Sequence, residues 1–284
     1  MKLQWYPGHM TKARREMQRD LQLVDLVIEL LDARIPMSSR NPDIDRLAAN
    51  KFRMILLNKA DLSDPGANDA WVRYFDALGI RAIALDSRER TRMRAIEDLI
   101  KEVCREKFER DRRRGILNRP VRAMVAGIPN VGKSTFINSF AKKVSAKTGN
   151  KPGVTKSNQW IRLNPSAELL DTPGILWPKF DDEKVGEHLA FIGSINDDII
   201  DAEALCHAFL LDAGTRNREA LEDRYHTEYD ADPNIFVERI ALSRNLLKKG
   251  GLPDTEKAAA ALIDDFRSGK LGRISLEYPE EYGN

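Results

Sequence analysis

The sequence predicts an α/β domain followed by an all-α domain, and two observations support this division. Short apolar runs that end in polar loops alternate with helix-like stretches through the first 171 residues, which is the pattern of a parallel sheet covered by helices. After Pro178, segments with the apolar periodicity of helices replace the short runs. We therefore expect one domain at residues 1–178 and a second at residues 179–284.

Six apolar runs are expected to form the strands of the sheet. They are Val24–Leu31, Met54–Leu57, Ile80–Leu85, Val121–Ala126, Trp160–Leu163 and Ala167–Leu170. Helices are expected between several of them, at Ile44–Asn50, Asn68–Leu78 and Arg92–Phe108. In the second domain three helices are expected to begin after Asp201, at Asp232-Pro233 and at Asp254 or Thr255, the second ending at Gly250-Gly251 and the third near Gly269.

The composition excludes several classes of protein. The chain has 284 residues, of which 42% are apolar and 32% charged, so collagen, coiled-coil and disulfide scaffolds do not fit. Two cysteines, Cys104 and Cys206, are too few for a disulfide framework or a four-cysteine metal site, which favours a reducing compartment. Neither a signal-peptide pattern nor an apolar segment long enough to span a bilayer is found. We expect a cytoplasmic protein with no membrane partner, and we expect it to be monomeric.

The net charge of +2 conceals two halves of opposite sign. Residues 1–178 hold 33 Lys and Arg against 21 Asp and Glu, whereas residues 179–284 hold 13 against 23. The segment Arg105–Arg122 is the most basic part of the first half. A basic half is typical of a protein that contacts nucleic acid, and an acidic half is typical of a solvated helical surface.

A phosphate-binding loop follows the strand expected at Val121–Ala126. The loop has the sequence Gly127-Ile128-Pro129-Asn130-Val131-Gly132-Lys133-Ser134-Thr135 and leads into a helix-like stretch. This is a Walker A motif in its strand–loop–helix context. Its backbone N–H groups would surround the phosphates, Lys133 would neutralise the β- and γ-oxygens, and Ser134 would offer its hydroxyl to Mg²⁺.

Two further segments are candidates for contact with Mg²⁺ and the γ-phosphate. Asp171-Thr172-Pro173-Gly174 ends the last expected strand, where Asp171 could hold a water bound to Mg²⁺ and the Gly174 N–H could meet the γ-phosphate. Thr155 lies in a basic loop between the two motifs and is a candidate second hydroxyl ligand for Mg²⁺. A turn without a ligand remains the alternative for this loop.

The base is expected to bind where two other strands end. Asn58-Lys59-Ala60-Asp61 follows Met54–Leu57, and a carboxylate there can accept from the ring N–H and the exocyclic amine of guanine, a pair that adenine does not present. The Lys59 stem can cover the base, and Asn58 can link this loop to the phosphate loop. Asp86 and Ser87 follow the next strand and are candidates for a contact with the base edge. The sequence therefore favours GTP and GDP over ATP.

These motifs occur in an unusual order, because the base-binding loops precede the phosphate-binding loops. This order indicates a circularly permuted Ras-like P-loop GTPase domain, with the Arg105–Arg122 segment as the new connection. The chain resembles the bacterial ribosome biogenesis GTPase A family (RbgA, also YlqF), on these motifs and on two more, Trp5-Tyr6-Pro7-Gly8-His9-Met10 and Asp32-Ala33-Arg34-Ile35-Pro36.

The resemblance implies a cytoplasmic GTPase that binds the precursor of the large (50S) ribosomal subunit and its rRNA, promotes a late assembly step and leaves after GTP hydrolysis. It also implies hydrolysis that the ribosome stimulates, and a K⁺ ion bound by Asn130 beside the phosphates. An asparagine that only stiffens the loop is the alternative for Asn130.

The segment after Gly174 lacks a side chain that could orient water, because Ile175, Leu176 and Trp177 follow it where Ras-type enzymes carry a glutamine. Turnover by the chain alone is therefore expected to be slow. The resemblance offers His9 as the water-positioning residue, and a histidine that helps to cap the following helix is the alternative. A GTP-regulated RNA-binding switch and an accessory protein of tRNA modification, both with little intrinsic turnover, remain alternative functions.

Overall fold

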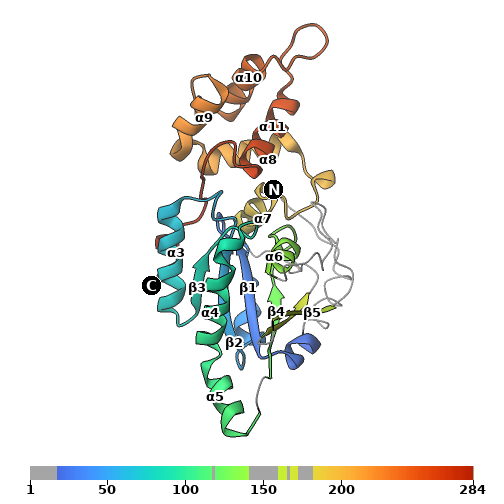
Figure 1. The fold of residues 1–284 in the computed structure, drawn as a ribbon. Helices are drawn as coiled ribbons and strands as arrows, with labels where there is room; N and C mark the ends of the chain where they lie inside the picture. The colour runs from blue at the N-terminus through green and yellow to red at the C-terminus, as the bar shows by residue number, and fades with distance from the viewer. Residues whose placement is uncertain (1–17, 117–118, 141–158, 165–166, 172–181, 284) are drawn as a thin grey trace. The chain divides into compact units, whose positions relative to one another are not determined.

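The computed structural model describes residues 18–116, 119–140, 159–164, 167–171 and 182–283 (Figure 1). They fall into two compact units. The α/β unit contains the described residues up to 171 together with 277–283, and the helical unit contains 182–276. The expected domain boundary at 178/179 lies outside the described residues.

The α/β unit is built on a six-stranded sheet with the order β3-β2-β1-β4-β6-β5. All six expected apolar runs form strands, which are β1 (Leu26–Asp32), β2 (Phe52–Asn58), β3 (Arg81–Ala84), β4 (Val121–Ala126), β5 (Gln159–Asn164) and β6 (Ala167–Asp171). Five strands run parallel, and β5 pairs with β6 in the antiparallel sense. The carboxyl ends of the parallel strands therefore meet at one edge, where sites of open α/β sheets form.

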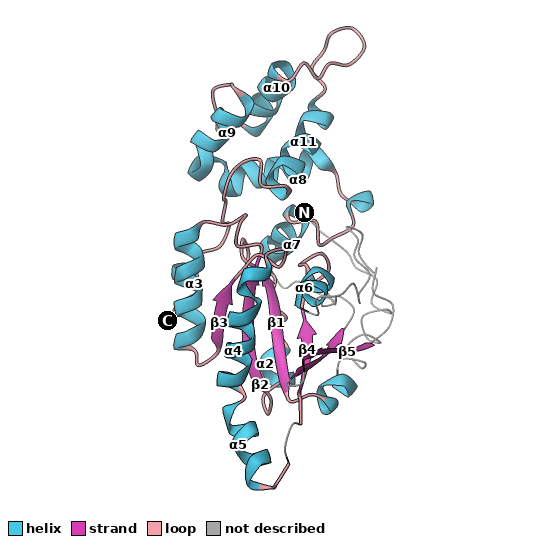
Figure 2. Cartoon of the chain, viewed as in Figure 1, coloured by secondary structure: helices cyan, strands magenta, loops and turns pink. Residues whose placement is uncertain are grey.

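Helices cover both faces of this sheet (Figure 2). Residues 18–23 are helical, and the other helices are α2 (Ile44–Leu47), α3 (Pro65–Ala77), α4 (Met93–Val103), α5 (Arg105–Arg113) and α6 (Lys133–Phe140). In Figure 2, α4 lies in front of the sheet and α2 behind it. The single helix expected at Arg92–Phe108 is instead two helices, because the backbone leaves the helical conformation at Cys104, with φ −96° and ψ 15°.

The core of the α/β unit explains the apolar runs. Every residue of β1 is buried, and on one face Leu31 packs with Leu57, Trp71 and Phe75. The one charged side chain in the middle of β1, Glu29, is 2% exposed and accepts hydrogen bonds from Arg40 Nε at 3.1 Å and Arg53 Nε at 3.0 Å. Burial of these apolar side chains stabilises the sheet by about 25 cal/mol per Å² removed from water.

The end of the chain packs on the α/β unit. Glu277 is fully buried, and its carboxylate accepts the backbone N–H of Met37 at 2.7 Å and both the N–H and the hydroxyl of Ser38. The Trp71 Nε1–H donates to the Glu277 carbonyl at 3.1 Å, and the Tyr282 ring lies 5.6 Å from the Trp71 ring. Residues 277–283 are therefore part of this unit, an arrangement that nothing in the sequence analysis anticipated.

The helical unit contains α7 (Glu183–Phe191), α8 (Ala202–Phe209), α9 (Arg218–Tyr225), α10 (Pro233–Ser243) and α11 (Thr255–Arg267), with the short turns Asp197–Ile199, Leu210–Gly214 and Thr215–Asn217. Asp201, Asp232 and Asp254 cap α8, α10 and α11 through their side chains, as their positions predict. The expected end of α10 at Gly250 is wrong, because the chain turns at Asn245, whose φ is +54°, and Leu246 N donates back to the Ala241 carbonyl.

Both cysteines are free and fully buried, and burial raises the pKa of each thiol to about 12. No helix in the described part of the chain has the length and apolarity needed to cross a membrane.

Candidate functional site

Strand register brings the segments expected to bind the base and the phosphates to one edge of the sheet (Figure 1). Asp32 at the end of β1 lies opposite Asn58 at the end of β2, and Asp171 at the end of β6 lies opposite Val125 near the end of β4. The loop that begins at Gly127 follows β4 directly. Segments far apart in the sequence, on either side of the Arg105–Arg122 connection, therefore share one edge of the sheet.

The two glycines of the phosphate loop are required by close packing. A Cβ on Gly127 would lie 2.6 Å from the Leu30 carbonyl oxygen, and one on Gly132 would lie 2.4 Å from Asn58 Nδ2. Gly132 also has a φ of +100°, a left-handed conformation that side chains disfavour. The loop thus keeps a bare backbone against β1 and Asn58, which is the form that a phosphate cradle needs.

Asn58 links three segments of the site. Its Nδ2 donates to the Val131 carbonyl at 2.7 Å, and its Oδ1 accepts from the Ser87 N–H at 2.9 Å and the Ser87 hydroxyl at 2.7 Å. The expected link between the base-binding loop and the phosphate loop is therefore present. Asn58 and Ser87 are each 2% exposed, so these bonds form in a buried environment where losing one partner is costly.

Lys133 extends back into the phosphate loop. Its Nζ donates to the carbonyl oxygens of Gly127 at 3.1 Å and Ile128 at 2.9 Å, and the residue is 7% exposed. Ser134 and Thr135 follow in the first turn of α6. A lysine ammonium and a helix N-terminus thus converge on this loop, as anion binding requires.

Lys59 is held by an ion pair with the buried Asp32, which the sequence did not reveal. Its Nζ lies 3.0 Å from Asp32 Oδ2, and both carboxylate oxygens of Asp32 accept from Arg34, from Nε and Nη2 at 2.9 Å each. Burial raises the pKa of Asp32, but the charges of Arg34 and Lys59 outweigh it and hold this pKa well below its usual range. Asp32 and Arg34 were noted only as part of a family-like motif, and their contact with Lys59 depends on strand register.

Asp61 and Asp86 come together around an arginine that the sequence analysis also missed. Arg88 Nη2 lies 2.5 Å from Asp61 Oδ2 and 2.8 Å from Asp86 Oδ2. Ala60 donates its N–H to the Leu85 carbonyl at 3.1 Å, so the loops after β2 and β3 are joined by backbone as well. A hint existed in the sequence, since Arg88 follows directly on Asp86-Ser87.

The remaining candidates divide between the described and undescribed parts of the chain. Asn130 lies in the phosphate loop with a left-handed φ of +59°. Asp171 is the last residue of β6, and its side chain is not among those that the structure describes. His9, Thr155 and Gly174 lie outside the described residues.

Comparison with known proteins identifies the family. A protein family described as 50S ribosome-binding GTPase matches residues 122–238. Ribosome biogenesis GTPase A of Bacillus pumilus is 45% identical over 281 residues, which cover 99% of this chain and 100% of the relative. The chain belongs to the ribosome biogenesis GTPase A family.

Another member, from Thermotoga maritima, is 33% identical over 98% of this chain and 95% of its own length. Among solved structures, GDP-bound TM YlqF matches with a TM-score of 0.69 at 30% identity and covers 94% of this chain and 100% of its own. GNP-bound YlqF from T. maritima gives a TM-score of 0.66 at 30% identity, covering 95% and 99%.

The family membership agrees with the fold and the motifs. The expected fold, a permuted GTPase domain followed by helices, and the expected class of enzyme, a GTP hydrolase with a P-loop, are confirmed. The match to residues 122–238 begins in β4 and leaves out Asn58–Asp61, because in this chain that motif precedes the P-loop strand.

Proposed function

We propose that this GTPase binds the immature large (50S) ribosomal subunit, promotes a late step of its assembly and dissociates after hydrolysing GTP. The observation that carries the proposal is the assembly of the base-binding and phosphate-binding loops by Asn58 in a chain of this family. The partners would be the subunit precursor and its rRNA, and the protein would act as a monomer in the cytoplasm.

Each motif has a proposed role at the nucleotide. Asp61 reads guanine, the stem of Lys59 covers the base, and Ala60, Asp86 and Ser87 shape the base-binding edge. The N–H groups of Val131, Gly132 and Thr135 surround the phosphates, Lys133 neutralises them, and the Gly174 N–H meets the γ-phosphate.

Magnesium fits the donor atoms that the chain offers. Ser134 in the first turn of α6 and Asp171 at the end of the neighbouring β6, with Thr155, would supply oxygen ligands, which Mg²⁺ prefers. Magnesium bound with the nucleotide would neutralise charge on the β- and γ-phosphate oxygens.

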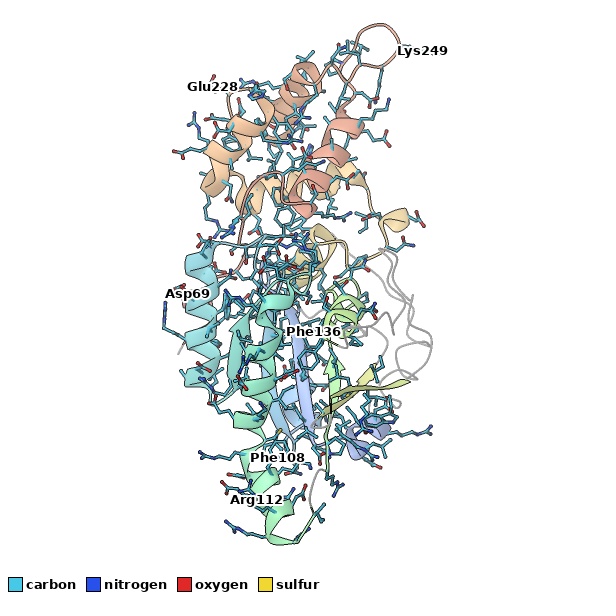
Figure 3. The ribbon with its side chains drawn as sticks, in the orientation of Figure 1. Asp69, Phe108, Arg112, Phe136, Glu228 and Lys249 are labelled. Carbon is cyan, nitrogen blue, oxygen red and sulfur yellow. The ribbon has the colours of Figure 1, made fainter. Side chains whose placement is uncertain are left out.

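Helix α5 offers a surface for rRNA. Five arginines of the segment 105–114 are exposed (Arg105, Arg110, Arg112, Arg113 and Arg114), and Arg105 and Arg113 are 80% and 82% exposed. Lys107 is fully buried, and its Nζ lies 2.7 Å from Asp111 Oδ2 and 3.8 Å from Asp25 Oδ2. These ion pairs anchor the helix beside the amino end of β1. Figure 3 shows Arg112 on this helix, at the end of the unit away from the nucleotide site. Phosphate contacts here would leave the nucleotide site free.

This surface can be tested by charge reversal. Arg112→Glu with Arg113→Glu is expected to weaken binding to precursor subunits at least tenfold and to reduce its salt dependence. Arg73→Glu with Arg94→Glu, on α3 and α4 of the same unit, makes the same change of charge and serves as the control. Equal effects of both pairs would mean that α5 has no special role.

His9 is the proposed water-positioning residue, because Ile175, Leu176 and Trp177 cannot orient water after Gly174. Turnover of the His9→Ala variant with and without large subunits tests this role. We expect stimulated turnover to fall by at least about tenfold, because a side chain that positions the attacking water and accepts its proton typically contributes about 10²- to 10⁴-fold. An unchanged stimulated rate would remove His9 from the mechanism.

Asn130 is the proposed K⁺ ligand, since it lies within the phosphate loop. A monovalent cation there would place positive charge where the bridging oxygen gains negative charge. We expect faster turnover in K⁺ than in Na⁺, and equal rates would exclude the assignment.

Co-sedimentation with precursor large subunits tests the proposed function itself. The chain should sediment with precursors in the presence of a non-hydrolysable GTP analogue and less so with GDP. If the protein does not sediment with precursors in the presence of either nucleotide, the proposal is contradicted. That result would favour an RNA-binding switch or a tRNA-modification accessory.

A further inference from the structure

Arg88 is anchored beside the guanine-reading segment by its neighbour in the chain. Ser87 is 2% exposed and is fixed to Asn58 through both its backbone N–H and its hydroxyl. The next residue, Arg88, donates its own N–H to Asp86 Oδ1 at 2.9 Å. The backbone of Arg88 is therefore held by a buried asparagine on one side and by a carboxylate on the other.

The guanidinium of Arg88 bridges two carboxylates. Its Nε lies 3.0 Å from each oxygen of Asp86, and its Nη2 contacts Asp86 Oδ2 at 2.8 Å and Asp61 Oδ2 at 2.5 Å. Burial raises the pKa of Asp86, but the hydrogen bonds from Arg88 outweigh it and lower this pKa. The arginine thus neutralises two like charges that lie close together and joins the loop after β2 to the loop after β3.

Asp61 can keep this contact while it binds guanine. A carboxylate has about four lone-pair sites. The paired N–H groups of guanine need one site on each oxygen, so Arg88 can occupy another site on Oδ2. The guanidinium fork is bidentate on Asp86, which fixes Nη2, and the single bond from Nη2 then holds Asp61 Oδ2 in place. A lysine could supply only a point charge.

We propose that Arg88 is a positioning residue for base specificity, which holds the Asp61 carboxylate in the orientation that accepts both N–H groups of guanine. The inference rests on the proposed role of Asp61. Arg88 is 67% exposed, so its ion pairs contribute little to folding, and its effect should be found in nucleotide discrimination.

The test compares the affinities for GDP and IDP, whose base lacks the exocyclic amine, by calorimetric titration. Arg88→Ala is expected to weaken GDP binding about tenfold and IDP binding about threefold. A carboxylate that can move loses more binding free energy when it must accept two N–H groups, as from guanine, than when it must accept one. The ratio of the two affinities should fall about threefold. Arg88→Lys keeps the charge and should show the same lowered ratio, since it lacks the fork.

Arg92→Ala is the matched control, because Arg92 lies four residues further on, is exposed and donates to the Ala84 carbonyl at 3.2 Å rather than to either carboxylate. It should leave the ratio unchanged. The proposal would be overturned if Arg88→Ala left the ratio of GDP to IDP affinity unchanged or bound GDP more tightly. It would also be overturned if Arg88→Lys kept the ratio of the unaltered chain.

Asp61→Asn separates this proposal from the one on which it depends. If Asp61 reads guanine, Asp61→Asn abolishes the preference for GDP over IDP whatever Arg88 does. A preference that survives in Asp61→Asn would overturn the base-site assignment, and with it the role of Arg88. Loss of preference in Asp61→Asn with no effect in Arg88→Ala would overturn the role of Arg88 alone.

Discussion

At the scale of single residues, the site depends on small contacts that only one side chain can make. Asn58 reaches the phosphate loop because Gly132 has no Cβ, and it reaches Ser87 through its other amide atom. A larger residue at position 132 would push Asn58 away and break both links together. The glycine therefore shapes the base-binding side of the site as well as the phosphate cradle.

Gly132→Ala should weaken GDP binding by more than tenfold. The new Cβ would lie 2.4 Å from Asn58 Nδ2 on a backbone with a φ of +100°, so the loop must move. Gly79→Ala is the control, because Gly79 also has a positive φ, +78°, but a Cβ there meets nothing within 4 Å. The control should lose about 1 kcal/mol of stability and keep its affinity. Equal affinities of both variants, measured by calorimetry, would contradict this prediction.

Local sequence patterns predict some residues of the site but not their long-range partners. The glycines, Asn58, Lys59, Asp61 and Lys133 were predictable because their spacing follows local strand–loop rules. Asp32, Arg34 and Arg88 were missed as partners, because their contacts depend on which strands become neighbours and in which register. Asp32 meets Lys59 only because β1 and β2 pair with Asp32 opposite Asn58.

At the scale of elements, the strands were the most predictable part of the fold and the chain end the least. Each strand is a short apolar run between turns, so its local sequence was sufficient. The break between α4 and α5 at Cys104 has no glycine or proline to signal it. The packing of Glu277 on Met37 joins residues 240 positions apart, which no local pattern can indicate.

Glu277→Ala should destabilise the α/β unit by about 3 kcal/mol, because it leaves the N–H groups of half-buried Met37 and buried Ser38 without their acceptor. Glu280→Ala removes an exposed carboxylate three residues away and should change stability by less than about 0.5 kcal/mol. Denaturant unfolding of both variants measures the difference. Equal midpoints would show that the segment 277–283 adds nothing to the stability of the unit.

Asp265 of α11 should make the helical unit sensitive to acid. Arg224 of α9 donates to it at 2.8 Å, Lys270 lies 3.4 Å away, and the Tyr225 hydroxyl donates at 3.2 Å. Burial raises the pKa of Asp265, but the hydrogen bonds and charges of Arg224 and Lys270 outweigh it and lower the pKa below the ordinary 3.8. A lowered folded-state pKa means that the stabilisation is full above the unfolded-state value and is lost as the pH falls through the folded-state pKa.

Asp265→Asn should therefore be less stable than the unaltered chain at pH 7. The difference in their free energies of unfolding should narrow as the pH falls below about 4. Urea unfolding of the two proteins across this pH range, monitored by far-ultraviolet circular dichroism, provides the measurement. A gap that stays constant with pH would show that the charge of Asp265 does not contribute.

In the whole molecule, circular permutation determines how the two units are connected in the chain. The segment that follows Gly174 runs within a few residues into the acidic helical unit, and the chain returns to the α/β unit at Glu277. The basic and acidic halves found in the sequence correspond largely to these two units. We predict that the contact proposed between Gly174 and the γ-phosphate is passed along the chain into the helical unit.

Hydrogen exchange should detect this coupling. Amides within residues 182–276 are expected to exchange at different rates with GDP and with a non-hydrolysable GTP analogue. Lys133→Ala, which removes the ammonium proposed to bind the phosphates, should abolish the difference. Identical exchange of the helical unit in both nucleotide states would exclude the coupling.

A single-turnover experiment on precursor large subunits that carry this protein loaded with GTP tests most directly whether the protein leaves after hydrolysis. Phosphate release and departure of the protein are followed in the same sample. We predict that departure follows phosphate release, and that the protein stays bound when a non-hydrolysable analogue replaces GTP. Departure at the same rate with GTP and with the analogue would contradict it.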